Sequence, residues 1–287
     1  MQAVHDVVET RDLVYRQVDG VALHLDLYRP ARSPADGAVV YLHGGAWLMG
    51  DRTEFSERFT ALAGAGVAVA SIDYRTVDHG AYPRQRDDIV AALGWLEEHR
   101  HEYGIAAPGT VLMGASAGAH LAALAALAFP DRVAGFVGMF GRYDLTSAAS
   151  ALRPAPGLAV PDVVRLASPP PGFEDLDPKG RLALLAGTPR DALTDDVLGR
   201  ISPVTQAHAG APAALLLHGT GDAIVSHAHS LRFAESLVAA GTREEVDVKL
   251  LPGANHEDPV FATSDVIREV TAFVHRCNAH TGARTRS

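Results

Sequence analysis

The feature of this 287-residue chain that most restricts its fold is the stretch Val111–His120. A short apolar run leads into Gly-Ala-Ser-Ala-Gly and then into an alanine- and leucine-rich segment, which predicts a buried strand, a sharp turn and a helix. A strand and a helix that meet at so tight a bend pass close together, so Gly114 and Gly118 leave the space that side chains would fill. The bend raises the Ser116 hydroxyl above the sheet and directs the Ala117 N–H toward developing negative charge. This order of elements favours that interpretation over an ordinary glycine-rich turn.

Composition and charge narrow the class of protein. The net charge is −9 and no basic stripe is present, which argues against a nucleic-acid partner. The single cysteine, Cys277, excludes an internal disulfide framework. The first residues lack the pattern of a signal peptide, and no run of about 18 apolar residues exists. We therefore expect a soluble, cytoplasmic protein without a membrane span, and the sequence leaves its oligomeric state open.

The rest of the chain alternates strand-length apolar runs with helical patterns, which predicts a single α/β domain over residues 1–287. The continuous apolar runs fit a mostly parallel central sheet with helices on both faces. Leu13 to Tyr28 alternates polar and apolar residues across Asp19-Gly20, which indicates a hairpin at a sheet edge. The tail Asn278–Ser287 is expected to be disordered. Further strands are expected at Ala38–Leu42, Val67–Ile72, Val133–Phe140, Ala213–Leu217 and Val246–Leu250, and helices at Thr53–Ala63, Arg84–His101, Ser226–Ala240 and Ser264–Cys277.

Residues 146–200 interrupt this alternation. The segment holds eight of the 17 prolines, which disfavours regular structure apart from short helical patches at Val160–Leu166 and Leu182–Ala186. Because it follows a strand, we expect it to form a cap over the site, in which Val163, Leu166 and Phe173 line the acyl or alcohol side of a pocket. The alternative is a surface excursion that packs on a distant flank.

A second glycine motif, His43-Gly44-Gly45-Ala46-Trp47, directly follows the expected strand Ala38–Leu42. The two glycines let backbone N–H groups face inward, as an oxyanion pocket requires, although a strand-ending turn would have the same composition. The serine turn downstream favours the oxyanion pocket. We expect His43 to orient this loop and Trp47 to contact substrate.

A serine hydroxyl is a poor nucleophile near neutral pH unless a base accepts its proton, and an imidazole base needs a carboxylate to hold its tautomer. Asp222 and His256 lie on loops after two consecutive expected strands, at the sheet edge where open α/β sheets place their sites. Asp144, after the preceding strand, is the rival acid, but the matched loops favour Asp222. No HExxH or CxxC grouping occurs, so neither a metal nor another cofactor is expected.

These motifs together resemble the α/β-hydrolase superfamily. Within it the chain is similar to the bacterial carboxylesterases related to hormone-sensitive lipase, particularly the feruloyl-esterase-like group, which is related to the arylformamidases. The resemblance covers residues 20–277. It is carried by HGGAW at 43–47, DYR at 73–75, GASAGAH at 114–120, GRYDL at 141–145, ISPV at 201–204, HGTGD at 218–222 and the late His256.

The resemblance implies a serine hydrolase that cleaves small-to-medium carboxylic esters through an acyl-enzyme intermediate. The alternatives are an arylformamidase-like amide hydrolase, and a non-hydrolytic cyclase, dehydratase or receptor built on the same fold. Ala46 and Ala119 stand where the family often has glycine, and both changes bear on the pocket. The implied roles are Ser116 as nucleophile, His256 as base, Asp222 as acid, and the N–H groups of Gly44, Gly45 and Ala117 as oxyanion donors.

Overall fold

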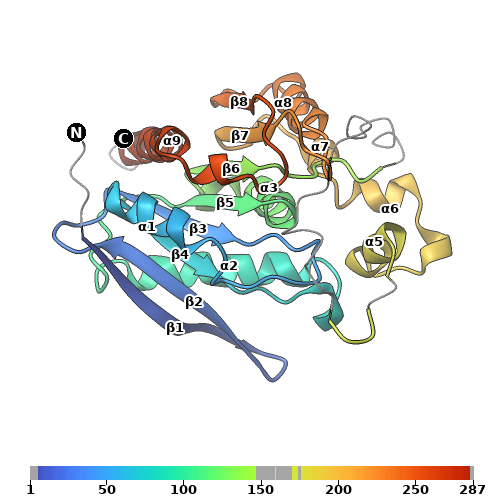
Figure 1. The fold of residues 1–287 in the computed structure, drawn as a ribbon, viewed down its shortest axis with the longest axis horizontal. Helices are drawn as coiled ribbons and strands as arrows, with labels where there is room; N and C mark the ends of the chain where they lie inside the picture. Colours follow the sequence, from blue (N-terminus) through green and yellow to red (C-terminus); the bar gives the residue numbers. More distant parts are fainter. Residues whose placement is uncertain (1–5, 147–158, 160–169, 174–175, 285–287) are drawn as a thin grey trace.

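The computed structural model describes residues 6–146, 159, 170–173 and 176–284. Its eight strands form one sheet in the order β1-β2-β4-β3-β5-β6-β7-β8 (Figure 1). The pairs β1–β2 and β2–β4 are antiparallel and every other pair is parallel, as expected of a mostly parallel sheet. The strands are β1 Val7–Val18, β2 Val21–Pro30, β3 Gly37–Leu42, β4 Val67–Ile72, β5 Val111–Ala115, β6 Gly135–Met139, β7 Ala214–Gly219 and β8 Val246–Leu251.

The expected edge hairpin is present. β1 and β2 pair from Val7↔Pro30 to Val18↔Val21, and the turn between them is Asp19-Gly20, both with positive φ. A two-residue turn with both φ angles positive matches the twist of the flanking strands. β1 closes one edge of the sheet and β8 the other.

Helices cover both faces of the sheet. α1 (Ser56–Gly64) and α9 (Ser264–Arg284) pack on one face. α2 (Arg84–His99), α3 (Ala117–Ala128) and α8 (Ala228–Ala239) pack on the other. Shorter elements are α5 Pro178–Ala186, α6 Asp195–Gly199, α7 Pro203–Gln206 and 3₁₀ turns at Val77–His79, Pro130–Arg132, Arg190–Ala192 and Pro259–Ala262.

The central strands are buried on both faces, which explains their continuous apolar sequences. In β3, Val39 and Tyr41 point into the core beneath α1 and α9, whereas Val40 and Leu42 point into the core beneath α2 and α3. Successive side chains of a strand alternate between its faces, so a strand covered on both sides has no position that faces solvent. The two cores thus fix the sheet and, with it, the loops at its ends.

The segment from 146 to 200 holds more regular structure than its prolines indicate. α5 begins at Pro178, in the first turn, where a missing N–H costs nothing, and Asp177 Oδ1 accepts the Gly180 N–H at 2.8 Å. α5 and α6 lie beyond the carboxyl ends of the parallel strands (Figure 1). The short helix expected at Val160–Leu166 lies outside the described residues.

The expectation of a disordered tail from residue 278 is wrong for the described part of that tail, because α9 continues to Arg284. Asn278 is 5% exposed; its Oδ1 accepts the Gly109 N–H and its Nδ2 donates to Val274 O, both at 2.9 Å. The bond to Gly109 anchors the last turns of the helix to the loop before β5. Residues 285–287 lie outside the described residues.

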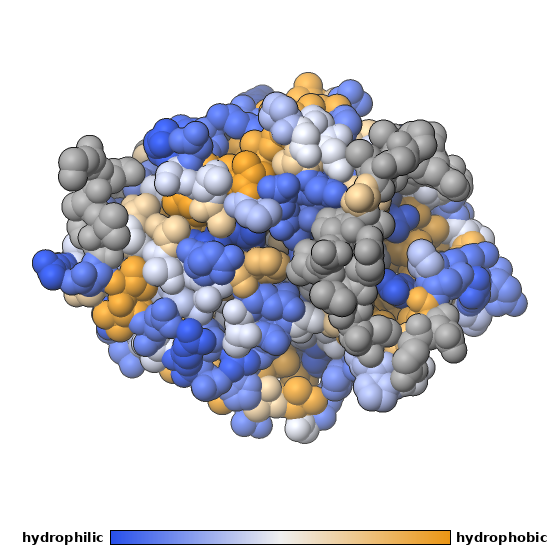
Figure 2. All heavy atoms as spheres, viewed as in Figure 1, coloured by the Kyte–Doolittle hydropathy of each residue, from blue (hydrophilic) through white to orange (hydrophobic). Residues whose placement is uncertain are grey.

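Among the described residues on the face shown in Figure 2, apolar side chains are interspersed with polar ones. The large apolar side chains that are exposed are scattered over β1, α8, β8 and the loop after β7. Within the described residues, no helix has both the length and the apolar character needed to cross a membrane.

We predict that Asn278→Ala lowers the free energy of unfolding by about 1 kcal/mol, because it leaves the partly buried Gly109 N–H without its acceptor. The control is His280→Ala on the exposed side of the same helix, which is expected to change stability by less than about 0.5 kcal/mol. Urea unfolding of the two variants makes the comparison. Equal stability would contradict the anchoring role of Asn278.

Candidate active site

Ser116 occupies the sharp turn between β5 and α3 that the sequence predicts. Its φ of 51° lies in the left-handed region, which is strained for a residue with a side chain. A Cβ on Gly114 would lie 2.4 Å from the Gly118 backbone, and one on Gly118 would lie 2.3 Å from the carbonyl oxygens of Leu42 and His43. Both glycines are therefore required by close backbone contact, as expected.

The structure brings Ser116, His256 and Asp222 together from the ends of β5, β8 and β7. His256 Nε2 lies 3.0 Å from Ser116 Oγ, and His256 Nδ1 lies 2.8 Å from Asp222 Oδ2. Because the carboxylate only accepts, the imidazole carries its proton on Nδ1, which leaves Nε2 free to accept the serine proton. Asp222 and His256 are 2% and 3% exposed, so both interactions are largely shielded from water.

The Asp222 carboxylate is fully engaged. Oδ1 accepts the backbone N–H groups of Ile224 and Val225, both at 2.8 Å, and Oδ2 faces the imidazoles of His256 and His218. Burial alone would raise the pKa of Asp222, but the hydrogen bonds from His218 and His256 hold it well below its usual range. The carboxylate therefore remains charged next to His256.

The loop that carries His256 is braced by Asn255. Its Oδ1 accepts the N–H groups of His256 at 2.8 Å and Ala223 at 2.9 Å, which connects the loops after β7 and β8. Its Nδ2 donates to the carbonyl of Ala159 at 2.7 Å, so the segment 146–200 reaches this loop. Phe140 packs edge-on against the imidazole with ring centroids 4.7 Å apart.

Asp144, the rival acid, has different partners. Its Oδ1 accepts from the backbone and hydroxyl of Thr146 at 2.9 and 2.7 Å, and Oδ2 lies 2.9 Å from Arg232 Nε. Within the described residues, His256 Nδ1 contacts Asp222 and not Asp144. Asp144 therefore stabilises the loop after β6, just before the segment 146–200.

The glycine loop after β3 lies directly against Ser116. A Cβ on Gly44 would be 3.4 Å from the Cβ of Ser116. Gly45, Ala46 and Trp47 all have positive φ, and a Cβ on Gly45 would overlap the carbonyl of Met49. This curled backbone lies next to the serine, and the role of its N–H groups as oxyanion donors remains a prediction.

The start of this loop is held by Tyr74. The Tyr74 and His43 rings stack with centroids 4.3 Å apart, and the Tyr74 hydroxyl donates to His43 O at 3.0 Å. His43 Nδ1 donates to Gly44 O at 2.8 Å, and burial lowers the pKa of His43, so the ring is neutral. His43 therefore orients the loop, as the sequence analysis expects.

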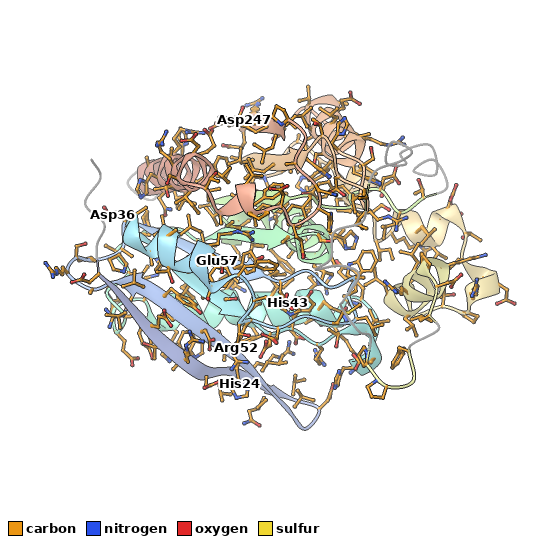
Figure 3. All side chains as sticks on the ribbon, in the orientation of Figure 1. His24, Asp36, His43, Arg52, Glu57 and Asp247 are labelled. Atoms are coloured by element: carbon orange, nitrogen blue, oxygen red, sulfur yellow. The ribbon has the colours of Figure 1, made fainter. Side chains whose placement is uncertain are left out.

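The end of the loop is held by Arg52. Its guanidinium contacts Asp73 Oδ2 at 2.6 Å, after β4, and Asp26 Oδ1 at 2.9 Å, on β2. Figure 3 shows Arg52 between the loop that begins at His43 and the strand that carries His24. The positive charge thus connects the loop to two strands of the sheet.

Trp47 is 5% exposed, and its indole N–H donates to His120 Nδ1 at 3.1 Å. His120 Nε2 in turn donates to Ile201 O at 2.7 Å, and burial lowers the pKa of His120 to about 4, so it stays neutral. The indole therefore anchors the loop, and its contact with substrate remains a prediction. His120 was not singled out from the sequence, although it is the last residue of the serine motif.

The structure tests the expected cap residues only in part. Phe173 is half-buried and packs against the core on the α2–α3 face, while Val163 and Leu166 lie outside the described residues. Within the described part of the chain, no group of three or more His, Cys, Asp or Glu side chains is placed to hold a metal ion.

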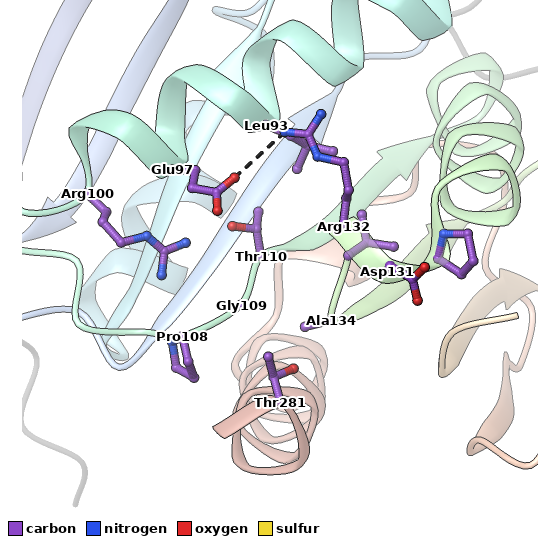
Figure 4. A pocket seen from close by; sticks show the side chains of 12 residues that line it. Leu93, Glu97, Arg100, Pro108, Gly109, Thr110, Asp131, Arg132, Ala134 and Thr281 are labelled. Atoms are coloured by element: carbon purple, nitrogen blue, oxygen red, sulfur yellow. Dashed lines mark ion pairs between the residues drawn. The ribbon is translucent and has the colours of Figure 1, made fainter. Parts of the chain in front are cut away.

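A separate cavity of about 340 Å³ opens at the opposite end of the sheet. It is lined by Thr110 and Ala134, which precede β5 and β6, and by the ion pair between Arg132 and Glu97 at 3.7 Å (Figure 4). Because it lies at the amino ends of the strands, it is distinct from the site around Ser116.

Comparisons with known proteins agree with this architecture. Esterase LipC of Mycobacterium tuberculosis is 28% identical over 254 residues, which are 83% of this chain and 57% of LipC. The probable carboxylic ester hydrolase LipM of the same organism is 28% identical over 300 residues, 96% of this chain and 64% of LipM. This chain thus spans about three fifths of the length of these two relatives.

Solved structures show the same fold. A truncated carbohydrate esterase from gut microbiota superposes with a TM-score of 0.73 at 20% identity, covering 97% of this chain and 99% of that one. Brefeldin A esterase, a bacterial homologue of human hormone-sensitive lipase, gives a TM-score of 0.70 at 22% identity, covering 96% and 79%. The BD-FAE family profile matches residues 25–237. The chain therefore belongs to the BD-FAE family and has the α/β-hydrolase fold of the esterases related to hormone-sensitive lipase.

Proposed function

We propose that this protein hydrolyses small-to-medium carboxylic esters, with Ser116 as nucleophile, His256 as general base and acid, and Asp222 as the carboxylate that orients it. The observation that carries the proposal is the continuous hydrogen-bonded row Ser116 Oγ, His256 and Asp222, at 3.0 and 2.8 Å. A strained, partly exposed serine beside a buried, oriented imidazole is what nucleophilic acyl transfer requires. The esterase names of the relatives support the same class of reaction.

In the first half-reaction the Ser116 proton moves to His256 Nε2 while Oγ attacks the ester carbonyl. The negative charge that develops on the carbonyl oxygen is stabilised by the N–H groups of Gly44, Gly45 and Ala117, the last at the amino end of α3. His256 then gives the proton to the departing alcohol oxygen, and the acyl group stays on Ser116.

In the second half-reaction water replaces the alcohol. His256 takes a proton from the water, the oxygen attacks the acyl carbon, and the proton returns to Ser116 Oγ as the carboxylic acid leaves. The charged Asp222 stabilises the imidazolium in both halves. No cofactor takes part in this sequence.

We predict that Ser116→Ala lowers the turnover of p-nitrophenyl acetate by roughly 10⁴-fold or more, because no other group can form the acyl-enzyme. The thermal unfolding temperature is expected to stay within a few degrees of wild type, since the hydroxyl points into the site and not into a core. Release of p-nitrophenolate by the purified protein measures the turnover, and a thermal melt followed by circular dichroism measures the unfolding temperature. Substantial remaining turnover would refute the mechanism.

Two experiments separate this proposal from its alternatives. A fluorophosphonate should label Ser116 stoichiometrically, whereas a receptor or a cyclase that forms no acyl-enzyme would not be labelled in this way. A panel of p-nitrophenyl esters of graded chain length, with an N-formyl aromatic amine included, then ranks ester against activated amide. Preference for the formyl amide would identify an arylformamidase-like enzyme.

The choice between the two acids gives a second prediction. Asp222→Asn is expected to lower kcat by around 10⁴-fold, because an amide no longer fixes the His256 tautomer. Asp144→Asn is expected to lower kcat by less than about tenfold and to act mainly on stability, because it weakens the contact with Arg232. Steady-state kinetics and urea unfolding of both variants make the test. A larger kcat loss in Asp144→Asn would overturn the assignment.

We also propose that the segment 146–200 forms a cap that selects substrates. Two hydrogen bonds and one buried side chain support this. Ala159 O accepts from Asn255 beside His256, Leu185 O accepts the Tyr82 N–H at 2.9 Å, and Leu185 itself is buried in the core. The contact of Ala159 with Asn255 ties the segment to the loop of His256, which supports a position next to the bound ester.

Replacing Phe173, Val163 and Leu166 together with serine is expected to shift the chain-length preference on the ester panel. The reason is that an apolar pocket lining favours esters with longer apolar chains. Fluorophosphonate labelling of Ser116 serves as the control for an intact site and should not change. An unaltered preference profile would show that these side chains do not reach the substrate.

A further inference from the structure

His218 is a buried group that the mechanism above leaves unused. It is the next-to-last residue of β7 and the first residue of the motif His-Gly-Thr-Gly-Asp, which ends at Asp222. Its exposed fraction is 0%, and it lies on the face of the sheet covered by α8. A polar side chain that is fully buried beside a charged carboxylate needs a physical explanation.

The contacts of His218 fix its tautomer. Nε2 lies 2.9 Å from Val225 O and 3.3 Å from Asp222 Oδ2, and both of these atoms only accept hydrogen bonds. Nε2 therefore carries the proton, with the carbonyl as its nearer acceptor and the carboxylate as the second. Nδ1 lies 2.8 Å from Ser230 Oγ on α8 and accepts from that hydroxyl.

The two oxygens of Asp222 are used differently. Oδ1 accepts two backbone N–H groups of its own turn, which fixes the plane of the carboxylate. Oδ2 faces two imidazoles, His256 Nδ1 at 2.8 Å and His218 Nε2 at 3.3 Å. The atom that orients the base therefore also lies within reach of a second imidazole N–H.

We propose that His218 is a positioning residue that acts on His256 through Asp222. It holds the 222–225 turn by its bond to Val225 O, and its N–H draws part of the negative charge of Oδ2 away from His256. This inference rests on the function proposed above, since it assigns His256 as the base.

The direction of the effect follows from charge. A neutral donor on Oδ2 weakens the attraction between the carboxylate and a protonated His256, so the imidazole loses its proton more readily. Removing that donor strengthens the attraction and keeps His256 protonated to higher pH. The other titratable groups that interact with these side chains are Glu257, which faces His256 and Asp222, and His229, which faces His218.

The test compares two substitutions that differ in the donor they leave. The amide of His218→Gln places an N–H near the position of Nε2, whereas the shorter amide of His218→Asn reaches only the position of Nδ1. The pH dependence of kcat/KM is then measured, because its acid limb reports the protonation of the base, His256, in the free enzyme. His218→Asn is expected to move that limb to higher pH by roughly half a unit or more and to lower kcat about tenfold, with little change in KM.

His218→Gln is expected to keep the acid limb within about 0.2 pH units of wild type and kcat within about threefold. The matched control is His229→Gln on α8, which removes a similarly buried imidazole that contacts Asp144 and not Asp222. It should leave the acid limb in place. An acid limb at the same pH in His218→Asn and in wild type would overturn the proposal. So would an equal shift of the acid limb in His218→Asn and in His229→Gln.

The wild-type protein offers a measurement that does not depend on the stability of any variant. In protein labelled with ¹⁵N-histidine, two-bond ¹⁵N–¹H correlations at pH 7 should show His218 protonated on Nε2 alone. Protonation on Nδ1 would overturn the proposal. Failure of wild type to hydrolyse any ester or amide would instead refute the proposed function, and the tautomer would still report on the contact with Asp222.

Discussion

The close backbone contact between the start of α3 and the end of β3 is the constraint on which the site depends. Gly118 packs against the carbonyl oxygens of Leu42 and His43, and only the absence of a side chain allows this approach. The contact forces Ser116 into the left-handed region, at a cost of about 1–3 kcal/mol, and places the glycine loop against its hydroxyl. The surrounding strands, buried on both faces, are rigid enough to hold this strained turn.

The motif Asp73-Tyr74-Arg75 explains how the glycine loop keeps its shape. Asp73 holds Arg52 at the end of the loop, and Tyr74 holds His43 at its start. Arg75 turns away from the site and forms a two-pronged ion pair with the buried Asp88 of α2, at 2.9 and 2.8 Å. Three consecutive residues after β4 thus fix both ends of the loop and the helix behind it. Asp88 therefore stabilises the fold and lies outside the site.

Buried imidazoles connect the loops at the carboxyl edge of the sheet. His120 joins Trp47 to the carbonyl of Ile201, and His218 joins Asp222 to α8. An imidazole suits this task because it donates on one side and accepts on the other, so both of its nitrogens can be satisfied without placing a charge in the core. The site is held by these connections between loops as much as by the sheet.

The sequence by itself determined which strands are buried on both faces, the serine turn with its two glycines and the edge hairpin. It favoured Asp222 over Asp144 as the partner of His256, and the structure decided between them. These features follow from local sterics, from apolar patterning and from the rule that parallel strands end at one edge of the sheet. Only the tertiary structure decided that Trp47 anchors its loop through His120, and that the tail stays helical because Asn278 bonds Gly109. Each of these outcomes depends on a hydrogen bond between residues far apart in the chain, which no local pattern encodes.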